Sequence, residues 1–414
     1  MSDASLPPHL ATAKRLLNTH DRFGGVAKTF HWLTALLILT MIPLGIVAQY
    51  WPYDTSEALN FKATLFSLHK TLGLVTFAVA LTRILWAISQ PRPVHLTKDS
   101  PLQTFAADAV HWSLYGALVL VPLSGWIHHA ASTGFAPIWW PFGQTLPFVP
   151  QSQAVADAFA GLHLAFNILL VASLVLHIAG AVKHHVVDRD ATLKRMLPGQ
   201  YALPTDLPAP HSTARPAAAA FGVWALAVAL GLTYGLAGDR VSATASLTAA
   251  PSQWMVEDGT LGLTVTQLGQ PVSGTFGEWV AAIDFDETPR DGQHGSVSVT
   301  VAVPSLTLGG VTEQALGAEF LNTQAFATAV FSGPILADED GDGYVVDGEF
   351  SLVGTTLPLR LPFDLDLTGD VAVAEGSVRL DRRDFGMGQT YTDESTVGFG
   401  VTIDVALTAR RDAE

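Results

Sequence analysis

The chain has 414 residues, of which 49% are hydrophobic and only 14% are charged, and its mean hydropathy is +0.33. This composition is typical of membrane proteins, and the length allows a helical bundle together with a separate domain. The absence of cysteine excludes disulfides, c-type haem attachment, Cys-ligated iron–sulfur clusters and zinc–thiolate sites. A redox centre in this chain would therefore have to be held by histidine.

The charge is unevenly distributed. The net charge is −15, and residues 240–414 contain no lysine, 8 arginines and 26 acidic residues. An acidic half without lysine argues against a nucleic-acid partner. It indicates instead a soluble domain that lies away from the anionic inner leaflet of a membrane.

Five apolar spans dominate the first half of the chain. A polar N-terminal segment, residues 1–28, precedes the first span, which is too long for a signal peptide and lacks a small-residue cleavage site, so we interpret it as an uncleaved anchor. Each span approaches the ~20 residues that a membrane helix needs. The predicted helices cover residues 29–48, 67–88, 110–129, 162–183 and 217–237. The last has neither histidine nor charge, which predicts a plain anchor helix.

Charged loops predict the orientation. Positive residues gather in the N-terminal segment, around Arg92 and between Lys183 and Arg215, whereas residues 130–161 contain none. The positive-inside rule then places the N-terminus in the cytoplasm and everything after Arg240 on the opposite side.

The sequence pattern changes after the fourth span. Residues 201–216, rich in Pro, Ala and Thr, are typical of a linker. From residue 254 onward, short segments alternate apolar and polar residues between Gly-rich breaks, which predicts antiparallel strands in a closed barrel or a sandwich.

Four histidines lie at matched depths in the predicted membrane helices. His163 and His177 are fourteen residues apart on one helix, a rise of about 21 Å, and they share a face to within about 40°. Helix direction places His31 at the inner depth of His177 and His69 at the outer depth of His163. Ionisable groups in hydrocarbon are costly and usually functional, so each pair is predicted to bind one haem iron axially.

Other residues compete with or extend this set. His111 and His128 are seventeen residues apart, but their angular offset of about 260° prevents both from facing one haem column. Arg83 lies on the face of His69, near the inner level, where it would either pair with a haem propionate or extend to the interface. Gly73 and Gly125 would allow a flat macrocycle to approach, although small residues also serve plain helix packing.

Residues 22–200 resemble the bacterial cytochrome b561 family of four-helix dihaem membrane proteins. The stretches that carry the resemblance are FHWL (30–33), LHKTLG (68–73), GLHLAFN (161–167), LVLHIAGAVKHH (174–185) and TLKRMLPG (192–199). The resemblance implies two b-type haems, electron exchange with ubiquinone, and superoxide as a proposed donor. It also implies His31, His69, His163 and His177 as the ligands, the set that depth alone selects.

Residues 252–411 resemble the YceI-like family of lipocalin-like barrels that bind polyisoprenoid chains. The resemblance is carried by LTVTQLGQPVSGTF (263–276), AEFLNTQAFATAVF (318–331), GEFSLVGTTLPLRLPFDL (348–365) and RRDFGMG (382–388). An eight-stranded barrel is wide enough to enclose one apolar ligand. Candidate pocket residues, each of which would equally suit an ordinary core, are Leu268, Phe276, Phe320, Phe326 and Phe350.

An acidic loop at residues 338–349 matches the spacing of a calcium loop through Asp338, Asp340, Asp342, Gly343 and Glu349. Its flanks are predicted strands rather than helices, so we favour an acidic hairpin turn over a calcium site. A catalytic triad has no support, because His294 is the only histidine between residues 240 and 414.

The sequence thus predicts a multi-pass protein of the bacterial inner membrane. Its predicted parts are a cytoplasmic segment (1–28), a four-helix dihaem bundle (29–200), a linker (201–216), an anchor helix (217–237) and a periplasmic all-β lipocalin-like barrel (252–411). The leading hypothesis is electron transfer between ubiquinone and a redox partner at the periplasmic face, with a quinone or polyisoprenoid in the barrel. Whether the chain is itself a quinone-linked oxidoreductase is open. The alternative is a membrane-anchored lipid-binding or lipid-transfer protein without redox activity, and a cytochrome subunit of a larger dehydrogenase is a third hypothesis.

Overall fold

The computed structural model describes residues 16–94, 101–132, 135–199, 212–237, 247, 250–338 and 343–411. The start of the chain, most of the predicted linker 201–216, and Asp340 and Asp342 of the acidic loop lie outside the described residues. The chain divides into two compact units. The helical unit comprises residues 1–49, 65–131 and 138–238, and the barrel unit comprises residues 50–64, 132–137 and 239–414.

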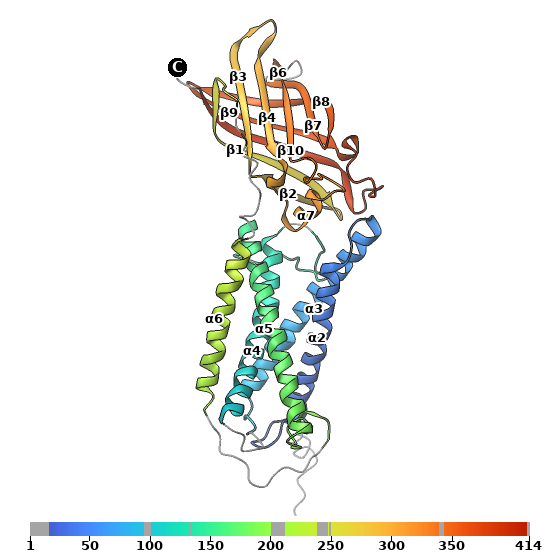
Figure 1. Ribbon diagram of the computed structural model, residues 1–414, viewed down its shortest axis with the longest axis vertical. Coiled ribbons are helices and arrows are strands. Elements are labelled where there is room, and N and C mark those ends of the chain that lie inside the picture. Colours follow the sequence, from blue (N-terminus) through green and yellow to red (C-terminus); the bar gives the residue numbers. More distant parts are fainter. Residues whose placement is uncertain are drawn as a thin grey trace, which may run out of the picture. The chain divides into compact units, whose positions relative to one another are not determined.

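Among the described residues, five helices are long and apolar enough to cross a membrane; Figure 1 shows them as α2 to α6. They are α2 (Gly25–Tyr50), α3 (Ser56–Ile88), α4 (Pro101–Ala131), α5 (Gln153–Val186) and α6 (Ala214–Ala237). Each contains one of the predicted spans and extends beyond it, because polar residues outside the hydrocarbon continue the same backbone hydrogen bonding. Pro43 and Pro122 lie inside α2 and α4.

The helix α6 packs on the bundle. It contacts α5 and α4 closely, and the rings of Trp224 and Phe166 meet edge to face with centroids 5.2 Å apart. Glycines make the approach of α6 to α5 close: a Cβ added at Gly161 would lie 2.2 Å from the carbonyl oxygen of Gly231. Small residues at helix interfaces serve this purpose in membranes. The predicted anchor helix therefore belongs to the bundle.

The tail that follows α5 returns to the start of α2. The side chain of Arg195 is buried and donates hydrogen bonds to the carbonyls of Val94 and Asp21. Lys28 and Trp32 in turn donate to the carbonyls of Leu197 and Met196. The TLKRMLPG stretch thus bonds to the segment after α3, to the residues before α2 and to the start of α2.

The second unit is a closed antiparallel barrel of eight strands, which confirms the predicted fold class. The strands follow one another in the order β1, β3, β4, β6, β7, β8, β9 and β10, and pairing of β10 with β1 closes the sheet. Two short strands, β2 and β5, extend the sheet from β1. The bounds are β1 Trp254–Gln267, β2 Gln270–Phe276, β3 Trp279–Arg290, β4 Gln293–Ala302, β5 Leu306–Thr307, β6 Thr328–Ala337, β7 Tyr344–Leu352, β8 Thr355–Thr368, β9 Val371–Asp381 and β10 Val397–Arg411.

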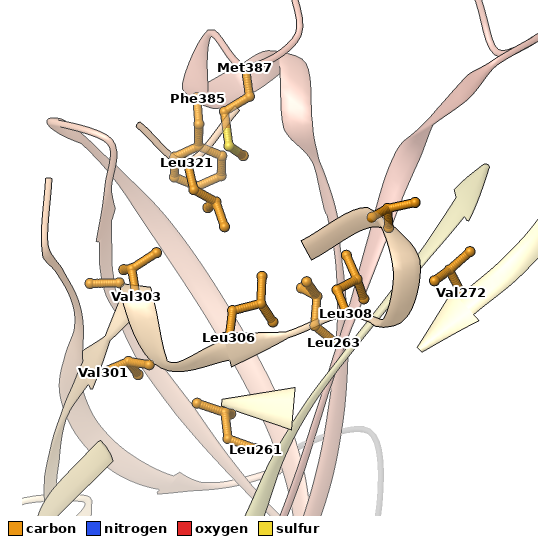
Figure 2. Packing of buried hydrophobic residues seen from close by; sticks show 12 residues of the cluster. Leu261, Leu263, Val272, Val301, Val303, Leu306, Leu308, Leu321, Phe385 and Met387 are labelled. Atoms are coloured by element: carbon orange, nitrogen blue, oxygen red, sulfur yellow. The ribbon is translucent and has the colours of Figure 1, made fainter. Parts of the chain in front are cut away.

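Alternating residues give the barrel an apolar interior. Along the whole of β8, partly buried residues alternate strictly with exposed ones, so its leucines face inward while Arg360, Asp364 and Asp366 face outward. A cluster of buried side chains from several elements gathers at one part of the interior (Figure 2). It includes Leu261, Leu263, Val301, Leu308, Phe385 and Met387.

The acidic loop joins two strands. Asp338 follows the end of β6, its backbone N–H donates to the carbonyl of Gly343, and β7 begins at Tyr344. These strand flanks agree with the hairpin interpretation.

The close approach of α6 to α5 gives a stability prediction. A Cβ at Gly235 would lie 2.3 Å from the carbonyl oxygen of Asp157, so Gly235→Ala forces the helices apart and should cost about 1–3 kcal/mol. We expect a lower melting temperature for the detergent-purified full chain, followed by circular dichroism at a helix-sensitive wavelength.

Gly222 on the same helix provides the matched control. A Cβ there would meet nothing within 4 Å, so Gly222→Ala should be neutral or stabilising by up to about 1 kcal/mol through helix propensity. Equal melting temperatures for Gly235→Ala and the parent chain would contradict this packing.

Candidate functional site

Two of the predicted ligands meet in the helical unit. His31 on α2 and His177 on α5 have ring centroids 6.1 Å apart, with the ring planes inclined by 55°. A metal–imidazole bond is about 2 Å long, so this spacing leaves room for one metal ion between the rings. The structure therefore brings together the pair that depth predicts for the inner level.

His69 and His163 are the second predicted pair. His69 on α3 lies within electrostatic range of His163 on α5. Glycines from neighbouring helices face both rings: a Cβ at Gly45 would be 2.8 Å from His69 Cε1, and one at Gly125 would be 3.0 Å from His163 Cε1. Gly125 was singled out from the sequence, whereas Gly45 was not, because close approach between two helices leaves no periodic signal.

The hydrogen bonds of His163 would suit it to bind a metal. His163 Nδ1 is 3.0 Å from the carbonyl oxygen of Val121 and 3.2 Å from Ser124 Oγ. A carbonyl only accepts, so Nδ1 carries the hydrogen and Nε2 keeps its lone pair for a metal, as in typical metal-binding histidines. Nδ1 of His69 is buried without a hydrogen-bond partner among the described residues.

The spacing of the helices also fits a flat macrocycle. The backbones of α4, α5 and α6 approach one another closely, whereas α2 and α3 approach the other described helices at few points. Each histidine pair joins one helix of the widely spaced group to α5. The residues present therefore fit haem held between imidazoles.

His111 on α4 lies closer to this arrangement than the sequence indicates. Its ring centroid is 5.1 Å from that of His177, at 82°, and its Nδ1 is 2.7 Å from the carbonyl oxygen of Ala107. His128, whose Nδ1 is 2.7 Å from the carbonyl oxygen of Ala156, lies within electrostatic range of His163. The geometry leaves His111 as a competitor of His31 for the position opposite His177.

Two basic side chains accompany the histidines. Arg83 lies within electrostatic range of His31 and His177, with its Cζ atom 6.0 Å from the centroid of the Tyr115 ring. Lys70, next to His69, is only 7% exposed and lies within electrostatic range of His69 and His129. Buried basic side chains are unusual in membrane helices. Lys70 was not predicted from the sequence, because a single lysine beside a histidine has no periodic signal.

A second candidate site is the interior of the barrel. It encloses a cavity of about 260 Å³ whose walls are almost entirely apolar. Phe276, Phe320 and Phe350 line it, as do Trp254 and Trp279. Such a cavity is suited to an apolar chain.

Two of the sequence candidates do not line this cavity. Leu268 lies in the two-residue turn between β1 and β2, where its φ of +50° and that of Gly269 at +74° are typical of a type I′ turn. Phe326 contacts the turn at Gly354, where an added Cβ would lie 2.9 Å from its ring. Neither residue is among those that line the cavity.

Arg382 is the charged side chain that the cavity wall buries most completely, with 3% exposure. All five of its N–H groups donate to backbone carbonyls, those of Gly398, Met387, Gly388, Tyr391 and Val397. Burial lowers the pKa of Arg382 from its ordinary value. The side chain ties β10 to the segment after β9 and has no donor left for a ligand.

Comparisons with known proteins find relatives of both parts of the chain. The model of the family "Prokaryotic cytochrome b561" matches residues 22–199, and that of the "YceI-like domain" matches residues 253–409. Cytochrome b561 homolog 2 of Escherichia coli (strain K12) is 33% identical over 184 residues, 44% of this chain and 93% of that protein. The probable superoxide oxidase CybB of Yersinia pestis is 26% identical over 180 residues, 43% of this chain and 97% of that protein.

Two solved structures are similar to part of this chain. BcnA of Burkholderia cenocepacia is 25% identical with a TM-score of 0.34, covering 36% of this chain and 95% of its own. A polyisoprenoid binding domain from Saccharophagus degradans is 11% identical with a TM-score of 0.30, covering 39% of this chain and all of its own.

The fold and the histidine pairs define a class: a helical membrane protein with paired imidazoles, joined to a lipocalin-like barrel. The chain belongs to the prokaryotic cytochrome b561 family, and its C-terminal part is a YceI-like domain.

The wall of the barrel cavity gives a second stability prediction. Arg382→Met leaves five buried carbonyls without their donors and should cost about 3 kcal/mol or more. The neighbouring Arg383 is exposed and pairs with Asp381, so Arg383→Met should cost less than about 1 kcal/mol. Urea unfolding of the full chain, monitored by proteolysis of the barrel, measures the change in unfolding free energy of each variant. Similar changes in the two variants would refute the structural role of Arg382.

Proposed function

We propose that this protein is an inner-membrane dihaem b-type cytochrome that passes electrons between ubiquinone and a partner at the periplasmic face. The observation that carries the proposal is the close approach of the His31 and His177 rings between apolar helices. His69 and His163 are proposed as the second pair from their matched depth, and they lie within electrostatic range of one another. We place the N-terminus in the cytoplasm, because the positive loops all lie on that predicted side.

The chain's own residues would hold and orient the two haems. Haem supplies one-electron exchange at its iron. The carbonyl of Val121 fixes the tautomer of His163, and the glycines beside His69 and His163 let the rings stand close to the neighbouring helices. Arg83 would hold a propionate of the inner haem.

Superoxide is a candidate electron donor. The relative from Yersinia pestis is named as a probable superoxide oxidase, and it aligns with nearly its whole length to the helical part of this chain. Superoxide is a small anion, and the buried basic side chain of Lys70 beside His69 would attract it when protonated.

We propose that the barrel, residues 252–411, binds a polyisoprenoid or the tail of a quinone. Its closed wall and apolar cavity support this function, since a prenyl chain offers no polar atom and excludes water from such a lining. The assignment of residues 29–200 to electron transfer and of 217–237 to anchoring completes the proposed organisation. The same cavity also supports the alternative, a membrane-anchored lipid-binding protein without redox activity.

The haem pairs can be counted directly. Pyridine haemochrome and reduced-minus-oxidised spectra of detergent-purified protein should give two b haems per chain. His163→Ala and His177→Ala should each remove one haem and spare the other, because each removes a ligand of a different pair.

Two controls sharpen this experiment. His294→Ala, in the barrel, should retain both haems, and His111→Ala should retain both if His31 is the partner of His177. Loss of one haem in His111→Ala with none lost in His31→Ala would reassign the inner ligand. Absence of haem from the parent chain would favour the lipid-binding alternative.

Filling the barrel cavity should abolish isoprenoid binding. Ala374 on β9 lines the cavity, so Ala374→Trp places an indole where the prenyl chain would lie. Lipid extracted from the purified variant should contain at least tenfold less polyisoprenoid than that from the parent, measured by mass spectrometry.

The adjacent residue provides the control for this experiment. Val373 is 41% exposed on the same strand, so Val373→Trp adds the same side chain to the outer face and should leave the lipid content unchanged. Equal polyisoprenoid in Ala374→Trp and the parent would rule out this cavity as the binding site.

A further inference from the structure

The barrel cavity contains one polar atom that the protein leaves without a partner. Gln267, the last residue of β1, is 3% exposed and lines the cavity. Its Oε1 is buried and has no hydrogen-bond partner among the described residues. An unsatisfied buried acceptor is costly, so its position in a largely apolar wall points to a ligand.

A chain of hydrogen bonds fixes the direction of this amide. Within the barrel unit, the hydroxyl of Tyr391 donates to the backbone carbonyl of Tyr53, which can only accept. Gln314 Nε2 therefore donates to the Tyr391 hydroxyl oxygen at 3.1 Å, and Gln267 Nε2 donates to Gln314 Oε1 at 3.0 Å. The atom of Gln267 that remains open is then the acceptor Oε1 rather than an N–H donor.

Burial keeps the phenol of Tyr391 protonated. We call the hydrogen-bonded chain of Tyr391, Gln314 and Gln267 the relay. Tyr391 is 1% exposed, and its burial raises the pKa of the phenol to about 12. The phenol therefore keeps its proton at physiological pH, and the orientation of both glutamines follows from it.

The other polar side chains of the cavity wall are already occupied or point away. Arg382 uses all five N–H groups on backbone carbonyls. Glu375 is exposed on β9, and Gln314 uses both ends of its amide in the relay. Among the described lining residues, Gln267 is thus the side chain that offers a hydrogen-bonding atom to a ligand.

We propose that the barrel selects isoprenoids whose head group carries a hydroxyl, and that Gln267 Oε1 accepts the hydrogen bond from it. This inference rests on the proposed isoprenoid-binding function and names the ligand class. A prenol or a quinol supplies the proton that the site lacks. A quinone carbonyl or an ether oxygen is itself an acceptor and cannot donate to Oε1. The reduced form of a quinone should therefore bind more tightly than the oxidised form.

The test compares two ligands that differ only in the donor. Radiolabelled geranylgeraniol and its methyl ether are titrated against the full-length protein in detergent. The alcohol should bind about two- to twelvefold more tightly than the ether, which corresponds to the ~0.5–1.5 kcal/mol of one hydrogen bond to a neutral acceptor.

Three variants assign that preference to the relay. Gln267→Met keeps the volume and removes the acceptor, so it should bind both ligands with the affinity that the parent has for the ether. Tyr391→Phe should weaken the preference, because Gln314 loses the acceptor that orients it. Gln270→Met, at the exposed end of the same turn, is the matched control and should behave as the parent does.

The outcomes separate this inference from the function on which it rests. Equal binding of alcohol and ether by the parent, or equal loss of both in Gln267→Met, would overturn the selection of hydroxyl groups while leaving isoprenoid binding intact. Failure of the parent to bind either ligand would overturn the isoprenoid-binding function itself.

A second pair of probes distinguishes the two sources of the hydroxyl. Decylubiquinol and decylubiquinone are compared anaerobically, and the difference between the parent and Gln267→Met isolates the barrel from any quinone site among the helices. If Gln267→Met weakens binding of the quinol and the parent binds the quinol more tightly than geranylgeraniol, the ligand is a quinol. If Gln267→Met weakens binding of geranylgeraniol and the parent binds geranylgeraniol more tightly, the ligand is a prenol. No Gln267-dependent difference between quinol and quinone would contradict the inference.

Discussion

Polar atoms enclosed by hydrocarbon cannot bond to water, and both units of this protein are organised by that constraint. In the helical unit, the imidazoles of His31 and His177 approach one another between apolar helices, and the carbonyl of Val121 occupies the second nitrogen of His163. In the barrel, Arg382 meets five carbonyls. The few polar groups inside each unit therefore specify its geometry more sharply than the many apolar ones.

Local patterns were sufficient to predict the fold. Apolar runs of helix length identify all five helices, and strict alternation identifies strands such as β8. The ends were predicted less well, since α4 begins at Pro101, well before the apolar run starts, because a helix continues into polar sequence without any change of period. The packing of α6 on α5 depends on glycines in separate helices, which no single span reveals.

The site was predictable where it depends on helix geometry. A constant rise per residue matches His31 with His177 in depth, and the structure brings the two rings together. The hydrogen-bonded chain of Gln267, Gln314 and Tyr391 was not predictable, because these residues are far apart in the sequence and only the fold brings them together. Leu268 shows the same limit, because hydrophobicity suggests a pocket residue but Leu268 lies in a left-handed turn and does not line the cavity.

The difference between Arg382 and Gln267 explains how one apolar wall can serve both stability and recognition. Arg382 carries a full charge, yet every donor is used, so removing it damages the fold and no ligand can reach it. Gln267 is neutral, and the relay that fixes its amide nitrogen leaves the oxygen unpaired. A neutral group tolerates an open acceptor at a cost that one ligand hydroxyl can offset, whereas an unpaired buried charge would cost more than such a contact returns. The relay therefore places the open acceptor on a neutral amide.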